Sequence, residues 1–361
     1  MFAFFDANPD VPYIVLNSDD GIDSRDNYRA EGTPARVKNG YYIPEMPDAS
    51  TLLVLARRER VDVVRPFVWD DPDNQFVQDK FRAMYADLMH TVPFPGHTVT
   101  RTQAQVGADA SGRETLNGYE RQPLVSEWLE GCAAFAQRSE VRGTGPVSLV
   151  NAITSPWAHR PPKEWKPTPW FPIPWNKDQL ATFDKLPTLG FIHRPTFVTF
   201  TDEHGQRITR RGERDKILQA GWQAALLTLP EAQRAKAPAL IVAATGDDSG
   251  QITLLHSALN AYAAHGGPEI DTGKSDQFID TDKRLGNTGA ATLFMQMAIG
   301  VMGSYRDGGV SAAINLRDKD EASIVFISPP SDAQRKSQKH PHGGDVFAHR
   351  GTPAIDPANY R

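Results

Sequence analysis

Hydrophobic residues recur with clear periods along the C-terminal half of the chain, and they predict alternating strands and helices. Four short apolar runs predict strands, at 196–200, 239–243, 310–316 and 323–327. Three stretches with helical spacing predict helices, at 212–229, 249–262 and 288–302. The run at 239–243 is apolar throughout, which is typical of a strand buried on both faces, and Ser249 is the expected cap of the helix after it. This order predicts a mainly parallel sheet covered on both faces, whose last two strands form an antiparallel edge pair around the polar turn 317–321.

The N-terminal half has a similar pattern with longer polar stretches between the runs. Apolar, β-branched runs predict strands at 13–16, 51–55 and 61–64. A helix is expected from Asp73, a loop over 99–117, and another helix around Cys132. We therefore expect an α/β protein of two related halves. Their expected ranges are 1–154 for the first half and 186–328 for the second, followed by a polar, mobile tail over 329–361.

Prolines and tryptophans are concentrated in the segment 155–185, between the two expected halves. Proline removes a backbone donor and fixes φ, so the proline-rich part at 155–176 is expected to form neither a helix nor a central strand. We expect it to be a connector. Its indoles either pack between the halves or contact a partner, because each buries a large apolar area. The candidate partner-binding residues are Trp165, Trp170 and Trp175.

Composition excludes several classes of partner. The 361 residues have a formal net charge of −5, without the basic patch that nucleic acid requires. The single cysteine cannot form an internal disulfide. No apolar run approaches the roughly 18 residues of a membrane span, and the start of the chain lacks the features of a signal peptide. We expect a cytoplasmic location.

The segment 283–292 carries the most distinctive motif. Its turn Gly286-Asn287-Thr288, followed by small residues, resembles the turn that opens a helix in the thiolase-like condensing enzymes. The resemblance implies thiolase-like layering for the second half. It also raises an alternative function, an acyltransferase or condensing enzyme that uses Cys132 and Asn287. Such chemistry needs an activated thiolate and an aligned histidine. Alanines stand at 243–244, where that histidine is wanted, so we expect a structural turn and no catalytic residues.

Other candidate ligands have simpler explanations. The histidines of the tail, at 340, 342 and 349, lack the companion residues of a structural metal site. The acidic pairs at 19–20 and 247–248 follow expected strands, where α/β proteins place ligands, but solvated turns use the same residues. The chain has neither a GxxxxGK phosphate loop nor a serine nucleophile elbow. We therefore expect no cofactor and no metal.

Two further segments carry a family resemblance. They are LPTLGFIHRPTF at 186–197 and LTLPEAQRAK at 227–236. Together with the Asn287 turn, they resemble the C-terminal region of the bacterial type VI secretion lipase adapters. The resemblance implies a non-enzymatic adapter that binds a phospholipase effector and helps load it onto the spike protein of the secretion machine. The positions of the binding residues do not follow from it.

Overall fold

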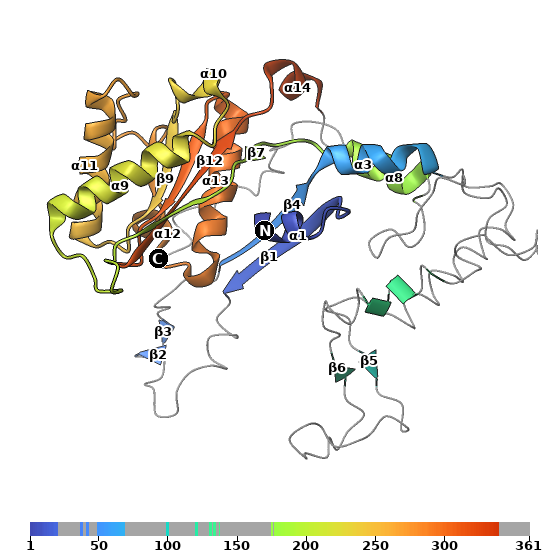
Figure 1. Cartoon of the computed structure of the whole chain (residues 1–361), viewed down its shortest axis with the longest axis horizontal. Coiled ribbons are helices and arrows are strands. Elements are labelled where there is room, and N and C mark those ends of the chain that lie inside the picture. The colour runs from blue at the N-terminus through green and yellow to red at the C-terminus, as the bar shows by residue number, and fades with distance from the viewer. Residues whose placement is uncertain are drawn as a thin grey trace, which may run out of the picture. The chain divides into compact units, whose positions relative to one another are not determined.

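The computed structural model describes two parts of the chain that are compact by themselves. The described residues are 1–20, 37–38, 41–42, 49–68, 99–100, 120–121, 130–131, 133–134, 137, 175 and 177–338. The N-terminal unit contains Met1–Tyr13 and Ala56–Leu186, and the C-terminal unit contains Ile14–Leu55 and Pro187–Arg361. The chain therefore passes between the units three times, and part of the expected first half belongs to the second unit (Figure 1).

The C-terminal unit is built on a mixed sheet of six strands. Across the sheet these are β10 (Phe278–Asp280), β9 (Leu240–Ala244), β11 (Ser311–Asn315), β12 (Glu321–Ser328), and then β7 (Phe191–Ile192) and β8 (Thr196–Thr199), which both pair with β12. β9 is parallel to β10 and β11, whereas β12 is antiparallel to its neighbours. The expected hairpin of β11 and β12 is confirmed, but its expected place at the edge is wrong. β7 and β8 lie beyond it.

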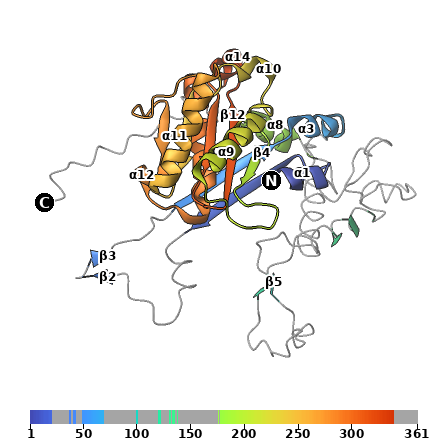
Figure 2. The ribbon, with the colours of Figure 1, turned by 60° about the vertical axis from the view of Figure 1, so that its left-hand side comes forward.

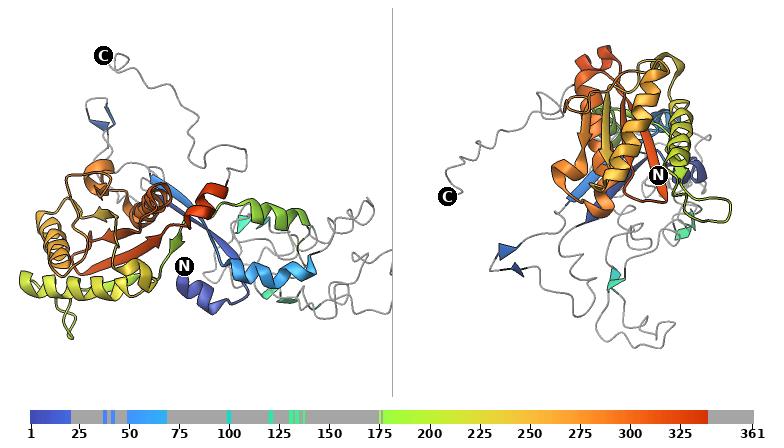
Figure 3. Two further views of the ribbon diagram at one scale, coloured as in Figure 1. Left: turned by 90° about the horizontal axis from the view of Figure 1, so that it is seen from above. Right: turned by 90° about the vertical axis from the view of Figure 1, so that its left-hand side faces the viewer.

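Helices cover both faces of this sheet. On one face lie α9 (Arg211–Leu226) and α11 (Ser249–Ala264), side by side (Figure 2). On the other lies α13 (Thr292–Asp307), so that the sheet stands between α9 and α13 (Figure 3). The short helices are α10 (Glu231–Arg234), α12 (Thr281–Leu285) and the 3-10 turn η3 (Gly289–Ala291). All three longer helices were predicted. The cap of α11 is Asp248 rather than Ser249, because the Asp248 carboxylate accepts hydrogen bonds from Gly250 N and Gln251 N.

Alternation along the strands separates two apolar layers. Ala312 and Ile314 of β11 face α9 and α11, whereas Ala313 faces α13 with Met297. β9 is buried at every position, as its unbroken apolar run predicted. Gln296 of α13 is fully buried, and its side-chain amide donates to the carbonyl oxygens of Val242 (3.1 Å) and Ile314 (2.7 Å). These bonds tie α13 to β9 and β11.

A two-stranded sheet from the N-terminal part of the chain completes the apolar layer at α13. Its strands are β1 (Tyr13–Asp20) and β4 (Ala49–Ala56), and both were predicted. Leu53 of β4 packs against the cluster that Met297 of α13 forms with buried residues of β11 and β12, whereas Leu52 on the opposite face is 65% exposed. The short strands β2 (Val37–Lys38) and β3 (Tyr41–Tyr42) pair antiparallel within the same unit.

The expected polar tail begins with a helix. Helix α14 (Asp332–Ser337) starts at Ser331, whose hydroxyl accepts a hydrogen bond from Gln334 N. Arg335 donates to the carbonyl oxygen of Tyr305 at 2.6 Å, which fixes α14 to the end of α13. The prediction of a mobile tail from residue 329 is therefore wrong as far as residue 338, because side-chain contacts hold this polar segment in place.

The described part of the N-terminal unit is mainly helical. It contains α1 (Phe2–Ala7), α3 (Arg58–Val64), the 3-10 turn η1 (Arg65–Phe67), α8 (Lys177–Lys185) and the antiparallel pair β5 (Val99–Thr100) and β6 (Glu120–Arg121). The prediction of a strand at 61–64 is wrong. Val61 and Val64 are spaced by one helical turn, and both are buried against Phe183 of α8. Arg65 joins the same helices through two hydrogen bonds to Asp184, at 2.7 and 2.6 Å.

Candidate functional site

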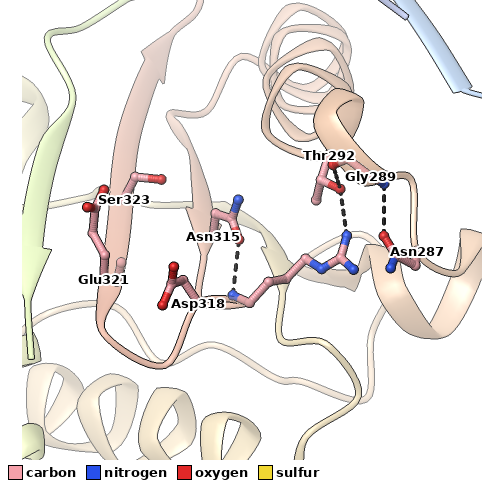
Figure 4. Close-up of a pocket in the computed structure, with 9 residues that line it drawn as sticks. Asn287, Gly289, Thr292, Asn315, Asp318, Glu321 and Ser323 are labelled. Carbon is pink, nitrogen blue, oxygen red and sulfur yellow. Dashed lines mark hydrogen bonds between the residues drawn. The ribbon is translucent and has the colours of Figure 1, made fainter. Parts of the chain in front are cut away.

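A pocket of about 460 Å³ opens in the C-terminal unit, on the face of the sheet that carries α13 (Figure 4). Three features form it: the turn before α13, the ends of β11 and β12, and the hairpin between these strands. Its described lining residues are Asn287, Gly289, Thr292, Asn315, Arg317, Asp318, Glu321, Ala322 and Ser323. Nearly all of them are polar, so the pocket is suited to hydrogen bonding and charge rather than to an apolar ligand.

The turn at Asn287 is held by its own side chains. Gly286 ends α12 with a φ of 81°, a conformation that glycine adopts without a Cβ clash. The Asn287 side-chain oxygen accepts a hydrogen bond from Gly289 N at 2.8 Å, and the hydroxyls of Thr288 and Thr292 are 2.9 Å apart. These bonds start η3 and α13. The Asn287 oxygen is thus used within the turn, and the turn follows α12 rather than a strand.

Arg317 lies across the pocket and joins its two walls. Its guanidinium donates to the Thr292 hydroxyl at 2.9 Å, and its Nε lies 3.7 Å from Oδ1 of Asp282. The Asp282 side chain is only 5% exposed, and Gly246 N donates to its other oxygen at 2.6 Å. The pKa of Asp282 is raised, first because burial disfavours the charged carboxylate, while Gly246 and Arg317 oppose the rise. The contacts with Thr292 and Asp282 hold the Arg317 guanidinium in place.

The hairpin beside the pocket carries paired charges. Asp320 is bonded to Arg207, with one Nη2–Oδ2 distance of 2.6 Å, and Lys319 lies 3.1 Å from Asp248. These cations lower the pKa of each carboxyl, and the hydrogen bond from the cation is the first cause in both cases. The two carboxylates of the lining, at 318 and 321, form no ion pair with any cation in the described part of the chain, although Oδ1 of Asp318 accepts a hydrogen bond from Asp320 N at 2.7 Å. They leave the pocket with excess negative charge.

Two regions of the chain match one protein family. Residues 189–329 match the C-terminal region of the type VI lipase adapter protein Tla3, and residues 1–39 match its N-terminal region. The chain belongs to the type VI lipase adapter protein Tla3 family. The resemblance found in the sequence is thereby confirmed at the level of the family. The C-terminal match spans the whole six-stranded sheet and the pocket, and the N-terminal match includes α1 and β1 of this Tla3-family protein.

The structure brings only some of the sequence candidates to the pocket. Asn287 lines it, with Gly286 and Thr288 in the same turn. Trp175 lies in the N-terminal unit, where its ring is 5.7 Å from that of Phe183. The other candidates lie outside the described residues: Cys132, Trp165, Trp170 and the tail histidines.

Sequence reasoning missed most of the residues that make this pocket in the Tla3-family chain. Asp318 and Glu321 were read only as part of a polar turn, and Ser323 only as part of a strand. These residues are far from Asn287 along the chain, so the sequence does not show that they lie close to it in the fold. Among the described residues, no three His, Cys, Asp or Glu side chains gather where they could hold a metal ion. No helix of the described ranges is long and apolar enough to cross a membrane.

Proposed function

We propose that the protein is a non-enzymatic, cytoplasmic adapter that binds a phospholipase effector of the type VI secretion system and helps load it onto the spike protein. The family matches at residues 1–39 and 189–329 carry this proposal, because the family is one of type VI lipase adapters. Binding to the spike goes beyond the family description. It follows from what an adapter of a secreted effector has to do before export.

The chemistry of the pocket supports a binding role over a covalent one. Its described lining includes neither the thiol nor the imidazole that thiolase-like condensing chemistry needs. The Asn287 oxygen is already bonded to Gly289 N, and Arg317 is bonded to Thr292. The end of β9, at Ala243 and Ala244, is fully buried. An α/β scaffold with a preformed polar pocket suits recognition of another protein.

The thiolase-like layering, the relation between the two halves and the connector role of 155–185 stay predictions. A thiolase-like layering predicts that the strand order of the C-terminal unit, β10-β9-β11-β12-β7, matches that of the condensing enzymes. Helix α8 occupies the C-terminal end of the expected connector, and Trp175 packs on its Phe183. The indoles at 165 and 170 remain our proposed partner contacts.

Affinity purification of the tagged chain from a bacterium that produces its secretion system tests the adapter role. We expect mass spectrometry to identify a lipase in the eluate at physiological salt, together with the spike protein. Deleting the lipase gene should remove the spike protein from the eluate, because loading requires the effector. Purification that recovers neither protein above a tag-only control would contradict the proposal.

A further inference from the structure

Two polar side chains of the pocket lining, Ser323 and Asn315, are accessible to a ligand. Ser323 is only 7% exposed, and its hydroxyl makes no hydrogen bond to the other lining residues drawn in Figure 4. Its cross-strand neighbour Asn315 uses its side-chain oxygen to accept from Arg317 N at 3.1 Å, which leaves the amide NH₂ group to donate. The Ser323 hydroxyl and the Asn315 NH₂ group are therefore available to hydrogen-bond a ligand in the pocket.

The carboxylates around Ser323 and Asn315 favour a ligand with positive charge. Glu321 lies two residues before Ser323 on β12, so both side chains are on the same face of the sheet. Neither Glu321 nor Asp318 has a cation within ion-pair distance in the described residues, whereas Asp282 has Arg317. The pocket therefore offers two carboxylates that are not matched, and a cationic group complements them.

An exposed aromatic ring borders the same row of residues. Phe197 of β8 is the cross-strand partner of Ser323, and directly paired residues of neighbouring antiparallel strands lie on one face. Its side chain is 63% exposed. An arginine or lysine has an apolar stem as well as a charged head, so its stem can pack on the Phe197 ring while its head reaches Glu321.

We propose that this pocket binds a basic side chain, arginine or lysine, that the lipase partner presents on a surface segment. Glu321 and Asp318 pair with the cation, and the Ser323 hydroxyl oxygen accepts a hydrogen bond from it. The Asn315 NH₂ group donates to a backbone carbonyl oxygen of the same partner segment, and Phe197 packs on the stem of the basic side chain. This assignment rests on the proposed adapter function. It adds to that function the place of contact and the chemistry of the contacting group.

A titration with a small probe tests the chemistry of the pocket without the partner. The full-length, ¹⁵N-labelled chain is titrated by NMR with Nα-acetyl-arginine methylamide, and separately with the citrulline analogue, which has the same shape without the charge. We expect saturable shifts of the Ser323 and Asn315 amide signals with the arginine probe alone, and none in Glu321→Gln. Absence of saturable shifts at millimolar probe, or equal shifts with citrulline, would overturn the assignment.

Affinity for the purified lipase tests the partner. Glu321→Gln should weaken binding about fivefold at low salt, the upper range for an accessible ion pair, and the loss should shrink as salt rises. Glu269→Gln is the matched control, because this exposed glutamate lies before β10, away from the pocket, and it should bind as the wild type does. Unfolding midpoints of both variants show that they are folded.

The outcomes separate the two proposals. If the wild type binds the lipase and Glu321→Gln binds it equally well, the pocket assignment fails and the adapter function stands. If the wild type does not bind the lipase, the adapter function fails and the partner assignment fails with it. The probe titration then still decides whether the pocket binds cations.

Discussion

Gly221 lies where α9 packs on β8, and an added methyl group has no room there. A Cβ at this position would stand 2.2 Å from Cγ2 of Val198, whereas carbon atoms in contact are about 3.5–4.0 Å apart. Val198 is 4% exposed, and its branched side chain has few alternative rotamers. Gly221→Ala therefore requires a local movement of about 1.3 Å or more, the difference between about 3.5 Å and 2.2 Å.

The two effects of Gly221→Ala have opposite signs. Overpacking in a core destabilises by about 1–3 kcal/mol, and replacing glycine by alanine within a helix stabilises by up to about 1 kcal/mol. We expect a net loss of about 1–2 kcal/mol in the free energy of unfolding. Gly212→Ala is the control in the same helix, because a Cβ there would contact nothing within 4 Å. It should be neutral or stabilising.

Urea denaturation followed by far-UV circular dichroism measures both variants, and Val198→Ala completes a double-mutant cycle. Val198→Ala alone should destabilise by about 2 kcal/mol, since it removes two buried methyl groups. In that background Gly221→Ala should no longer destabilise, because the new methyl occupies the vacated space. Equal losses from Gly221→Ala in both backgrounds would refute the close approach of α9 to β8.

Three other predictions follow from single contacts. Leu53→Asp should destabilise the C-terminal unit by about 2 kcal/mol or more in thermal unfolding. Leu52→Asp, on the exposed face of β4, should leave the stability nearly unchanged, and equal effects of the two substitutions would contradict the packing of β4. The hydrogen bond from Lys319 is the first cause of the lowered pKa of Asp248, so the contribution of this carboxylate to stability is present above its unfolded pKa and is lost as pH falls through its folded pKa. Asp248→Asn should therefore lower the unfolding midpoint at pH 7 and have the same midpoint as the wild type in acid. A difference in midpoint that does not change with pH would contradict this. Trp170→Ala should weaken lipase binding with an unchanged unfolding midpoint if this indole is a partner contact, whereas loss of stability alone would place it in the core.

Local periodicity was sufficient to predict much of the C-terminal unit. β9 is apolar at every position because both faces of the strand are covered, and this burial is visible in five consecutive residues. The stripe of α9, with Leu218, Trp222 and Leu226 buried, has the spacing of one helical face. The Asn287 turn was predicted to open a helix from its resemblance to the thiolase-like turn, and in the structure its side-chain oxygen does bond the backbone of that turn.

Features that depend on distant residues were not predictable in this way. The run at 61–64 is too short to distinguish a strand from a helix, and its helical form depends on burial against Phe183, far along the chain. The place of β7 and β8 beyond β12 is a matter of strand order, which no local pattern encodes. The composition of the pocket likewise depends on residues that are far apart in the sequence. Asn287 could be named from its motif, but only the fold places Glu321 and Ser323 beside it.

Quantitative binding of the full-length chain to the lipase effector tests the central claim most directly. Isothermal titration of the two purified proteins should show saturable binding with a defined stoichiometry. The account predicts that this binding persists after Cys132 is alkylated by iodoacetamide, because an adapter needs no reactive thiol. Absence of lipase binding, together with an acyl-thioester adduct on Cys132 detected by mass, would contradict it and establish the acyltransferase alternative.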